Sequence, residues 1–217
     1  MIPKELITVL TKAIKFAEET TYKDIKKGNL ALEEDITADL MKTIKLYCSD
    51  VIQTNEVNFG PYQVFTRIFK KSTEEPNVGA DLAITISKYE NKKNGFRKKV
   101  GVKTALIQSK LPSNKDYSKL KEQIEDMQEY TDESYVAVYN QDGVYVSHSK
   151  DVIDANYRVK NISNEKLQTL NSFFKDFFSC SKGEKGFDSR DILNKDEDIY
   201  YKTPLTNILE FVVTPND

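Results

Sequence analysis

Apolar residues in the first part of the chain recur every three or four positions, which is the spacing of an amphipathic helix. The first such run starts at Leu6 and predicts a helix to about Lys26, with Gly28 as the stop signal. A second helix is predicted to begin near Ala31 or Glu33. We expect the apolar faces of both helices to pack on the core.

Farther along, the pattern changes to short apolar and β-branched runs bounded by turn residues, which predicts strands. Asn94-Gly95 separates two of these runs and favours a type I′ turn, because both central residues of that turn need a positive φ. These two runs are therefore predicted to form a hairpin. The predicted strands cover residues 62–69, 82–86, 100–107, 134–139 and 144–147.

Two more helices and a tail complete the predicted order of elements. Pro112-Ser113-Asn114 is the expected cap of a helix to about Tyr130, segment 164–180 is predicted as another helix, and the tail after Pro204 as a short helix or strand. Strands interleaved with helices indicate an α/β fold with a central mixed β-sheet flanked by helices. We expect one domain over residues 1–217, with N-terminal helices in 1–50, the sheet and its site in 58–150, and a C-terminal helical packing segment in 151–217.

Composition and cysteine usage indicate a cytoplasmic protein. Apolar residues make up 39% of the chain and charged residues 30%, which is ordinary for a globular protein in solution. Cys48 and Cys180 lie 132 positions apart without metal-ligand spacing, so we expect reduced thiols. No apolar run approaches the ~20 residues that a membrane span needs, and no secretory signal is recognisable, so we expect neither secretion nor membrane insertion.

Charge is distributed unevenly along the chain, although the net charge is only −2. Between Arg67 and Lys110 there are eleven basic and four acidic residues, whereas the remaining chain has an excess of nine acids. A basic block inside an acidic body is typical of a protein that binds a phosphate backbone. A lysine-rich strand edge that prevents aggregation would produce the same charge run.

The predicted hairpin carries residues suited to a divalent metal. Asp81 precedes its first strand, and Gln108-Ser109-Lys110 ends its second. Residues two apart in a strand share a face, so Gln108 and Lys110 project to the same side. Pairing of the strands would bring Asp81 close to both. A hard cation such as Mg²⁺ or Mn²⁺ prefers oxygen ligands, which the Asp81 carboxylate and the Gln108 amide could supply, while Lys110 could orient an attacking water or offset developing negative charge.

Gly79-Ala80-Asp81, a hairpin, and then Gln108-Ser109-Lys110 together resemble the PD-(D/E)XK, or restriction-endonuclease-like, nuclease superfamily. The motif is similar to the bacterial branch with Gln in place of the second acid, found in type IV restriction enzymes and antiviral-defence effectors. The resemblance implies a mixed sheet flanked by helices, a divalent metal and cleavage of nucleic-acid phosphodiesters. It makes double-stranded DNA the default substrate, although the sequence does not distinguish DNA from RNA. The neutral Gln108 leaves the site one negative charge poorer than an acid would.

The resemblance also suggests residues around this motif. The superfamily often brings a Glu from an early helix to the metal. The helical stripe favours Glu33 for this role, and the Glu-x-x-Thr pattern favours Glu34. In nucleases of this branch a helix follows the Gln-x-Lys strand and flanks the site, which makes Gln123 a candidate to contact the phosphate or to support the residues around the metal. A helix-edge Gln that bonds a backbone carbonyl is an equal alternative. The basic residues expected to contact nucleic acid are Arg67, Lys70, Lys71 and Lys103.

The leading interpretation is a Mg²⁺-dependent endonuclease in which Asp81, Gln108 and Lys110 are catalytic. The rival interpretation is a non-catalytic nucleic-acid-binding or protein-interaction module on the same fold. A third interpretation is an α/β domain in which the lysine-rich hairpin is only a solvent-exposed surface. His148 is the only histidine, and it is expected to be a surface or capping residue, which argues against His-pair or Ser-His-Asp chemistry. Besides DNA, the expected partners are a sensor or regulatory protein, by analogy with defence effectors, and further copies of the same chain in a homo-oligomer.

Overall fold

A computed structural model gives the architecture of the chain. It describes residue 2 and residues 4–54, 62–70, 78–92, 97–189 and 207–215. The predicted Asn94-Gly95 turn and Lys71 lie outside the described residues. The helices are α1 (Lys4–Lys26), α2 (Glu33–Thr54), α3 (Tyr117–Gln128), α4 (Ser149–Asp154) and α5 (Leu170–Phe178), with short 3-10 turns at Val159–Asn161 and Asn164–Lys166.

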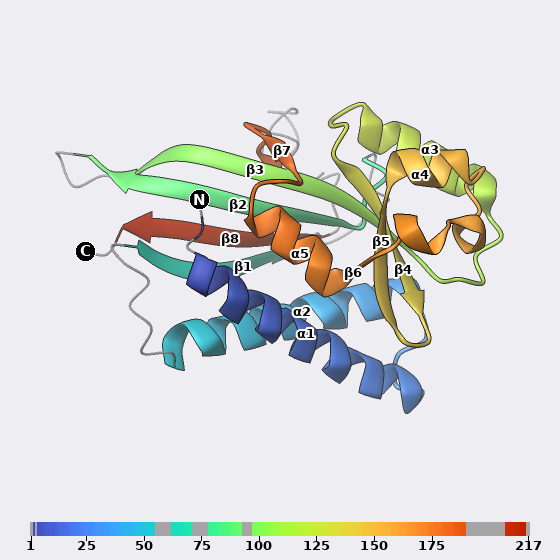
Figure 1. The fold of residues 1–217 in the computed structure, drawn as a ribbon, viewed down its shortest axis with the longest axis horizontal. Coiled ribbons are helices and arrows are strands. Elements are labelled where there is room, and N and C mark those ends of the chain that lie inside the picture. Colours follow the sequence, from blue (N-terminus) through green and yellow to red (C-terminus); the bar gives the residue numbers. More distant parts are fainter. Residues whose placement is uncertain are drawn as a thin grey trace.

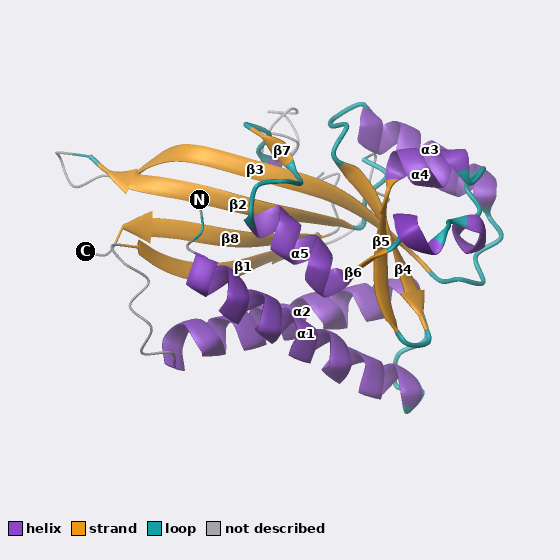
Figure 2. Cartoon of the chain, viewed as in Figure 1, coloured by secondary structure: helices purple, strands orange, loops and turns teal. Residues whose placement is uncertain are grey.

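The strands form one mixed sheet, as the sequence predicts (Figure 2). Their order across the sheet is β1-β8-β2-β3-β4-β5-β6, and β7 pairs with β3 beside this path. The β8–β2 and β3–β4 pairs are parallel, and the other pairs are antiparallel. The strands are β1 (Tyr62–Lys70), β2 (Leu82–Asn91), β3 (Arg97–Lys110), β4 (Ser134–Asn140), β5 (Gly143–His148), β6 (Gln168–Thr169), β7 (Glu184–Lys185) and β8 (Asn207–Pro215).

Three elements depart from the sequence predictions. The C-terminal segment is not only a packing segment, because β8 lies inside the sheet between β1 and β2 and β6 and β7 also join it. The helix predicted over 164–180 is wrong in its first half, since α5 starts at Leu170 with Thr169 as its cap. The α3 cap is Asp116, whose carboxylate accepts the N–H of Lys119, rather than Ser113 or Asn114.

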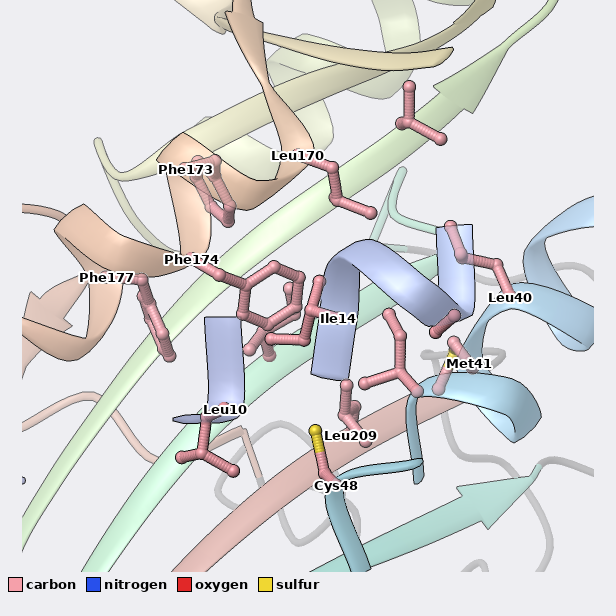
Figure 3. Packing of buried hydrophobic residues seen from close by; sticks show 14 of the residues in the cluster. Leu10, Ile14, Leu40, Met41, Cys48, Leu170, Phe173, Phe174, Phe177 and Leu209 are labelled. Carbon is pink, nitrogen blue, oxygen red and sulfur yellow. The ribbon is translucent and has the colours of Figure 1, made fainter. Parts of the chain in front are cut away.

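Helices cover both faces of the sheet (Figure 1). On one face α1, α2 and α5 pack on apolar residues of β2, β3, β4, β5 and β8, and Figure 3 shows Ile14 of α1, Met41 of α2 and Phe174 of α5 converging there. On the other face α3 and α4 pack on Ala83, Leu106 and further residues of the central strands. Alternate residues of a strand face opposite sides, so each central strand contributes to both cores.

Some smaller predictions are confirmed. The α1 helix ends at Lys26, and His148 caps α4 by accepting the N–H of Lys150 at its Nδ1. Both cysteines are free thiols; Cys48 is fully buried, and burial raises its pKa to about 12. In the described part of the chain, no helix is long and apolar enough to span a bilayer.

Candidate active site

The start of β2 and the end of β3 meet as the hairpin pattern predicts. Leu82 pairs with Ile107, and the N–H of Asp81 donates to the Ile107 carbonyl at 3.0 Å. This register brings Asp81 beside Gln108 and Ser109. Oδ2 of Asp81 accepts a hydrogen bond from the Gln108 amide Nε2 at 2.7 Å and another from the Ser109 backbone N–H at 2.8 Å. The predicted juxtaposition of acid and amide is therefore present.

The side chain of Gln108 is held in one orientation and is only 2% exposed. Its Nε2 donates to Asp81 and, at 3.2 Å, to the Ser109 carbonyl. Its Oε1 is buried and has no hydrogen-bond partner in the described part of the chain. A buried polar atom without a partner is costly, so this oxygen fits a position that faces a ligand.

Lys110 and Glu33 form an ion pair at the edge of the same site. Their Nζ and Oε2 atoms are 3.5 Å apart, and Lys110 is only 6% exposed. The other carboxylate oxygen of Glu33 accepts the backbone N–H of Leu111 at 2.7 Å. The first turn of α2 is thereby joined to the end of β3, and Glu33 reaches the predicted site.

Glu34, the alternative acid, is more exposed than Glu33. Its side chain is exposed, yet its negative charge acts on Asp81 through space. The structure thus places both early acids near Asp81, with Glu33 in direct contact with Lys110. Their neighbouring positions at the start of α2 make this proximity possible.

The carboxyl group of Asp81 has a perturbed pKa. Burial is the largest cause and raises the pKa from 3.8 to about 6, helped by the charges of Glu33 and Glu34. The Ser109 N–H and the Lys110 ammonium act in the opposite direction because they stabilise the carboxylate. A partly buried acid near other acids and beside a cation is the type of environment found at functional sites.

A cluster of three buried hydroxyl groups lies behind this site. Thr37 Oγ1 is 3.0 Å from Ser109 Oγ and 2.7 Å from Tyr139 Oη, and the two last atoms are 3.1 Å apart. The cluster joins α2, β3 and β4 at the residue whose N–H binds Asp81. The sequence did not predict this cluster, because Ser109 of the Gln-x-Lys motif, Thr37 of the Glu-x-x-Thr pattern and Tyr139 of the next strand are many residues apart.

Gln123 lies on the α3 face that meets the segment before β2. Gly79 approaches its backbone so closely that a Cβ at Gly79 would overlap the Gln123 carbonyl, and Gly79 has φ +69°. The Oε1 of Gln123 is buried without a hydrogen-bond partner among the described residues. The structure therefore places Gln123 near the Asp81 segment, as predicted for the helix that follows the motif.

The basic residues predicted to contact nucleic acid are not placed beside the Asp81 site by the described structure. Arg67 and Lys70 lie on β1, paired with Glu210 and Asn207, and their side chains are outside the described structure. Lys103 does not fit its predicted role. It shares a face with Ala105 and Ile107, whereas Gln108 and Lys110 share the opposite face with Leu106.

Lys103 is also buried, at 5% exposure, and its ammonium donates to the Phe177 carbonyl. Counting charges along the chain could not reveal this, because the end of α5 covers the lysine.

In the described residues, no group of three or more His, Cys, Asp and Glu side chains is arranged to hold a metal ion. A cation at the Asp81 site would therefore need the Gln108 amide oxygen as well as carboxylates. The chain matches no protein-family model, no curated protein and no solved structure, so the interpretation of the site depends on its own geometry.

Proposed function

We propose that this chain is a metal-dependent nuclease that hydrolyses phosphodiester bonds, similar to the Gln-x-Lys branch of the PD-(D/E)XK superfamily. One observation carries the proposal. The Asp81 carboxylate and the Gln108 amide are in contact at 2.7 Å, and the remaining amide oxygen is buried with no partner among the described residues. A carboxylate and an amide oxygen on neighbouring side chains are hard donors of the kind that Mg²⁺ or Mn²⁺ requires.

Asp81 and Gln108 would hold the divalent cation, with Glu33 or Glu34 as an additional oxygen donor. When bound, such a cation lowers the pKa of water and stabilises the negative charge that develops on a phosphoryl oxygen. The protein supplies orientation: the Ser109 N–H fixes one Asp81 oxygen at 2.8 Å, and the hydroxyl cluster fixes Ser109. This leaves the other Asp81 oxygen and Gln108 Oε1 as the candidate ligands.

Lys110 would act on the phosphate or the attacking water. Its ammonium is restrained by Glu33 at 3.5 Å, a long contact that leaves donor capacity for another oxygen. A lysine held in place by a partly exposed carboxylate can stabilise an anionic transition state without reorganising. Double-stranded DNA is the proposed substrate on the strength of the superfamily resemblance, and a defence or restriction system with a separate sensor is the proposed setting.

The first test is cleavage of plasmid DNA by purified protein with Mg²⁺ or Mn²⁺, compared with EDTA. Lys110→Ala should abolish metal-dependent cleavage, and Lys12→Ala is the matched control because Lys12 is an exposed lysine on α1. Equal cleavage by wild type and Lys110→Ala would refute the assigned site. RNA substrates run in parallel would decide between the two nucleic acids.

A non-catalytic binding module is the second candidate. It is favoured by the internal pairing of the site, in which Lys110 contacts Glu33 and Gln108 contacts Asp81. This alternative predicts DNA binding that is unchanged by EDTA, and no cleavage with either metal. A gel-shift titration beside the cleavage assay separates the two functions.

A further inference from the structure

A cavity of about 540 Å³ lies between the β2–β3 hairpin and the end of α5. This volume is within the range of small-molecule sites. Its described lining includes four lysines, Lys88, Lys99, Lys103 and Lys185, and no acidic residue. Apolar side chains such as Ile86 and Phe178 form much of the remaining lining. The combination of an apolar surface with cations only is suited to an anion that has an apolar body.

The four lysines are not equivalent. Lys88 pairs with Glu90 at 3.3 Å and Lys99 pairs with Asp188, so their charges are already compensated. Lys103 is buried, and none of the ion pairs between described residues includes it. Its ammonium donates to the Phe177 carbonyl and lies 4.2 Å from the centre of the Phe177 ring. A buried cation without a carboxylate partner is unfavourable, and this cost is consistent with a Lys103 pKa lowered by burial to about 8.

Lys185 adds a second positive charge next to Lys103. It lies on β7, which pairs with β3 at Lys103, and its side chain is exposed at the rim of the cavity. The thiol of Cys180, at the end of α5, also lines the cavity beside Lys103. An anionic group placed here would meet both lysines, while the apolar residues would contact a hydrocarbon chain.

We propose that this cavity binds an amphipathic carboxylate, with the carboxylate at Lys103 and Lys185 and the apolar chain against Ile86 and Phe178. A nucleic-acid backbone is a poorer occupant because it offers no apolar group to that lining. The cavity is separate from the candidate active site. Lys103 and Lys110 are seven positions apart on β3, about 20 Å along a strand, and they face opposite sides of the sheet.

The test compares three probes with the same chain and different head groups: octanoate, 1-octanol and octylamine. Isothermal titration calorimetry should detect octanoate binding that exceeds binding of the neutral and cationic probes. Lys103→Met should weaken octanoate binding about ten- to a hundredfold, because a hydrogen bond to a charged group is lost. Lys98→Met is the matched control, since Lys98 is an exposed lysine of the same strand outside the cavity lining.

Cys180 gives a second readout that does not depend on the stability of the Lys103 variant. Octanoate should slow alkylation of wild-type Cys180 by iodoacetamide, measured by mass spectrometry, and octylamine should not. Lys185→Ala, a change at an exposed rim position, should weaken octanoate binding about two- to fivefold. Equal binding of octanoate and 1-octanol, unchanged affinity in Lys103→Met, or absence of Cys180 protection would each overturn the proposal. None of these measurements uses nuclease activity, so the two proposals fail independently.

Discussion

Replacing Gln108 by Glu tests the contact on which the candidate active site depends. The two side chains have the same shape, but glutamate is ionised at neutral pH and cannot then donate to Asp81. Two carboxylates at the 2.7 Å separation now found between Nε2 and Oδ2 would repel by about 6 kcal/mol at an effective dielectric constant of about 20. In the absence of metal, the folded variant is therefore expected to retain one proton on the pair.

The expected loss of folding stability in Gln108→Glu can be worked out for the form that keeps one proton on the pair. At pH 7, above the Asp81 pKa of about 6, the two carboxyl groups of Gln108→Glu with one proton retained have the same net charge as the wild-type Gln108–Asp81 pair. The main cost is therefore keeping the proton that a free glutamate of pKa about 4.3 would release, about 4 kcal/mol at pH 7. Loss of the second donor, which bonds the Ser109 carbonyl at 3.2 Å, adds about 1 kcal/mol. At pH 5 the cost of the retained proton falls to about 1 kcal/mol, and wild-type Asp81 is itself mostly protonated there because its pKa is about 6.

The sign of the pH dependence follows from the protons bound. Above pH ~4.3 the unfolded variant has released a proton that the folded variant still holds. The destabilisation relative to wild type must therefore grow as the pH rises from 5 to 7. Divalent cation should reverse this destabilisation in Gln108→Glu, because its charge allows both carboxylates to ionise.

The assay is urea unfolding in EDTA at pH 5.5 and pH 7.5, followed by the same measurements in Mg²⁺. Gln141→Glu is the matched control, because Gln141 is exposed in the β4–β5 turn. If Gln108→Glu and wild type unfold at the same urea concentration in EDTA at pH 7.5, the Gln108 amide does not contact Asp81 and the site geometry is wrong. Destabilisation without recovery in Mg²⁺ would retain the geometry and reject the metal.

Three further changes test neighbouring features. Gly79→Ala should destabilise the fold by about 2–4 kcal/mol in urea unfolding, because it imposes a left-handed conformation on Ala and forces a Cβ into the α3 backbone. A loss below about 1 kcal/mol would contradict the close approach of Gly79 to the Gln123 backbone. Tyr139→Phe removes the hydroxyl bonded to Thr37 and Ser109 and should cost about 1 kcal/mol, also by urea unfolding; an unchanged stability would show that the cluster contributes nothing. The folded-state pKa of Lys103 is lowered to about 8, so the unfolded chain binds one more proton than the folded chain between about pH 8 and 10.5. In this range the stability of wild type should rise with pH relative to Lys103→Met, by at most about 1.4 kcal/mol per pH unit. Parallel pH profiles of the two proteins would refute the burial of this charge.

Local signals were sufficient for the part of the site that lies on the hairpin. Two β-rich runs and a turn sequence define the register of β2 and β3, and that register places Asp81 beside Gln108. The side shared by Gln108 and Lys110 follows from the two-residue period alone. This is why the central contact could be predicted without knowledge of any helix.

Features that depend on long-range packing could not be predicted in the same way. The apolar tail could be a helix or a strand, because a short continuous apolar run fits either, and only its pairing between β1 and β2 makes it a strand. The burial of Lys103 depends on α5, which follows it by more than sixty residues. Glu33 and Glu34 were equal candidates because the direction of α2 relative to β3 is a tertiary property.

The position of β8 has a consequence for how the chain folds during synthesis. β1 pairs with β8 and with no other strand in the described sheet, although β8 begins more than 130 residues later. At usual rates of translation, that interval corresponds to on the order of ten seconds or more. Throughout this time, neither edge of β1 and only one edge of β2 has a partner among the described strands. These unpaired edges are the places where a nascent chain would recruit chaperones or aggregate.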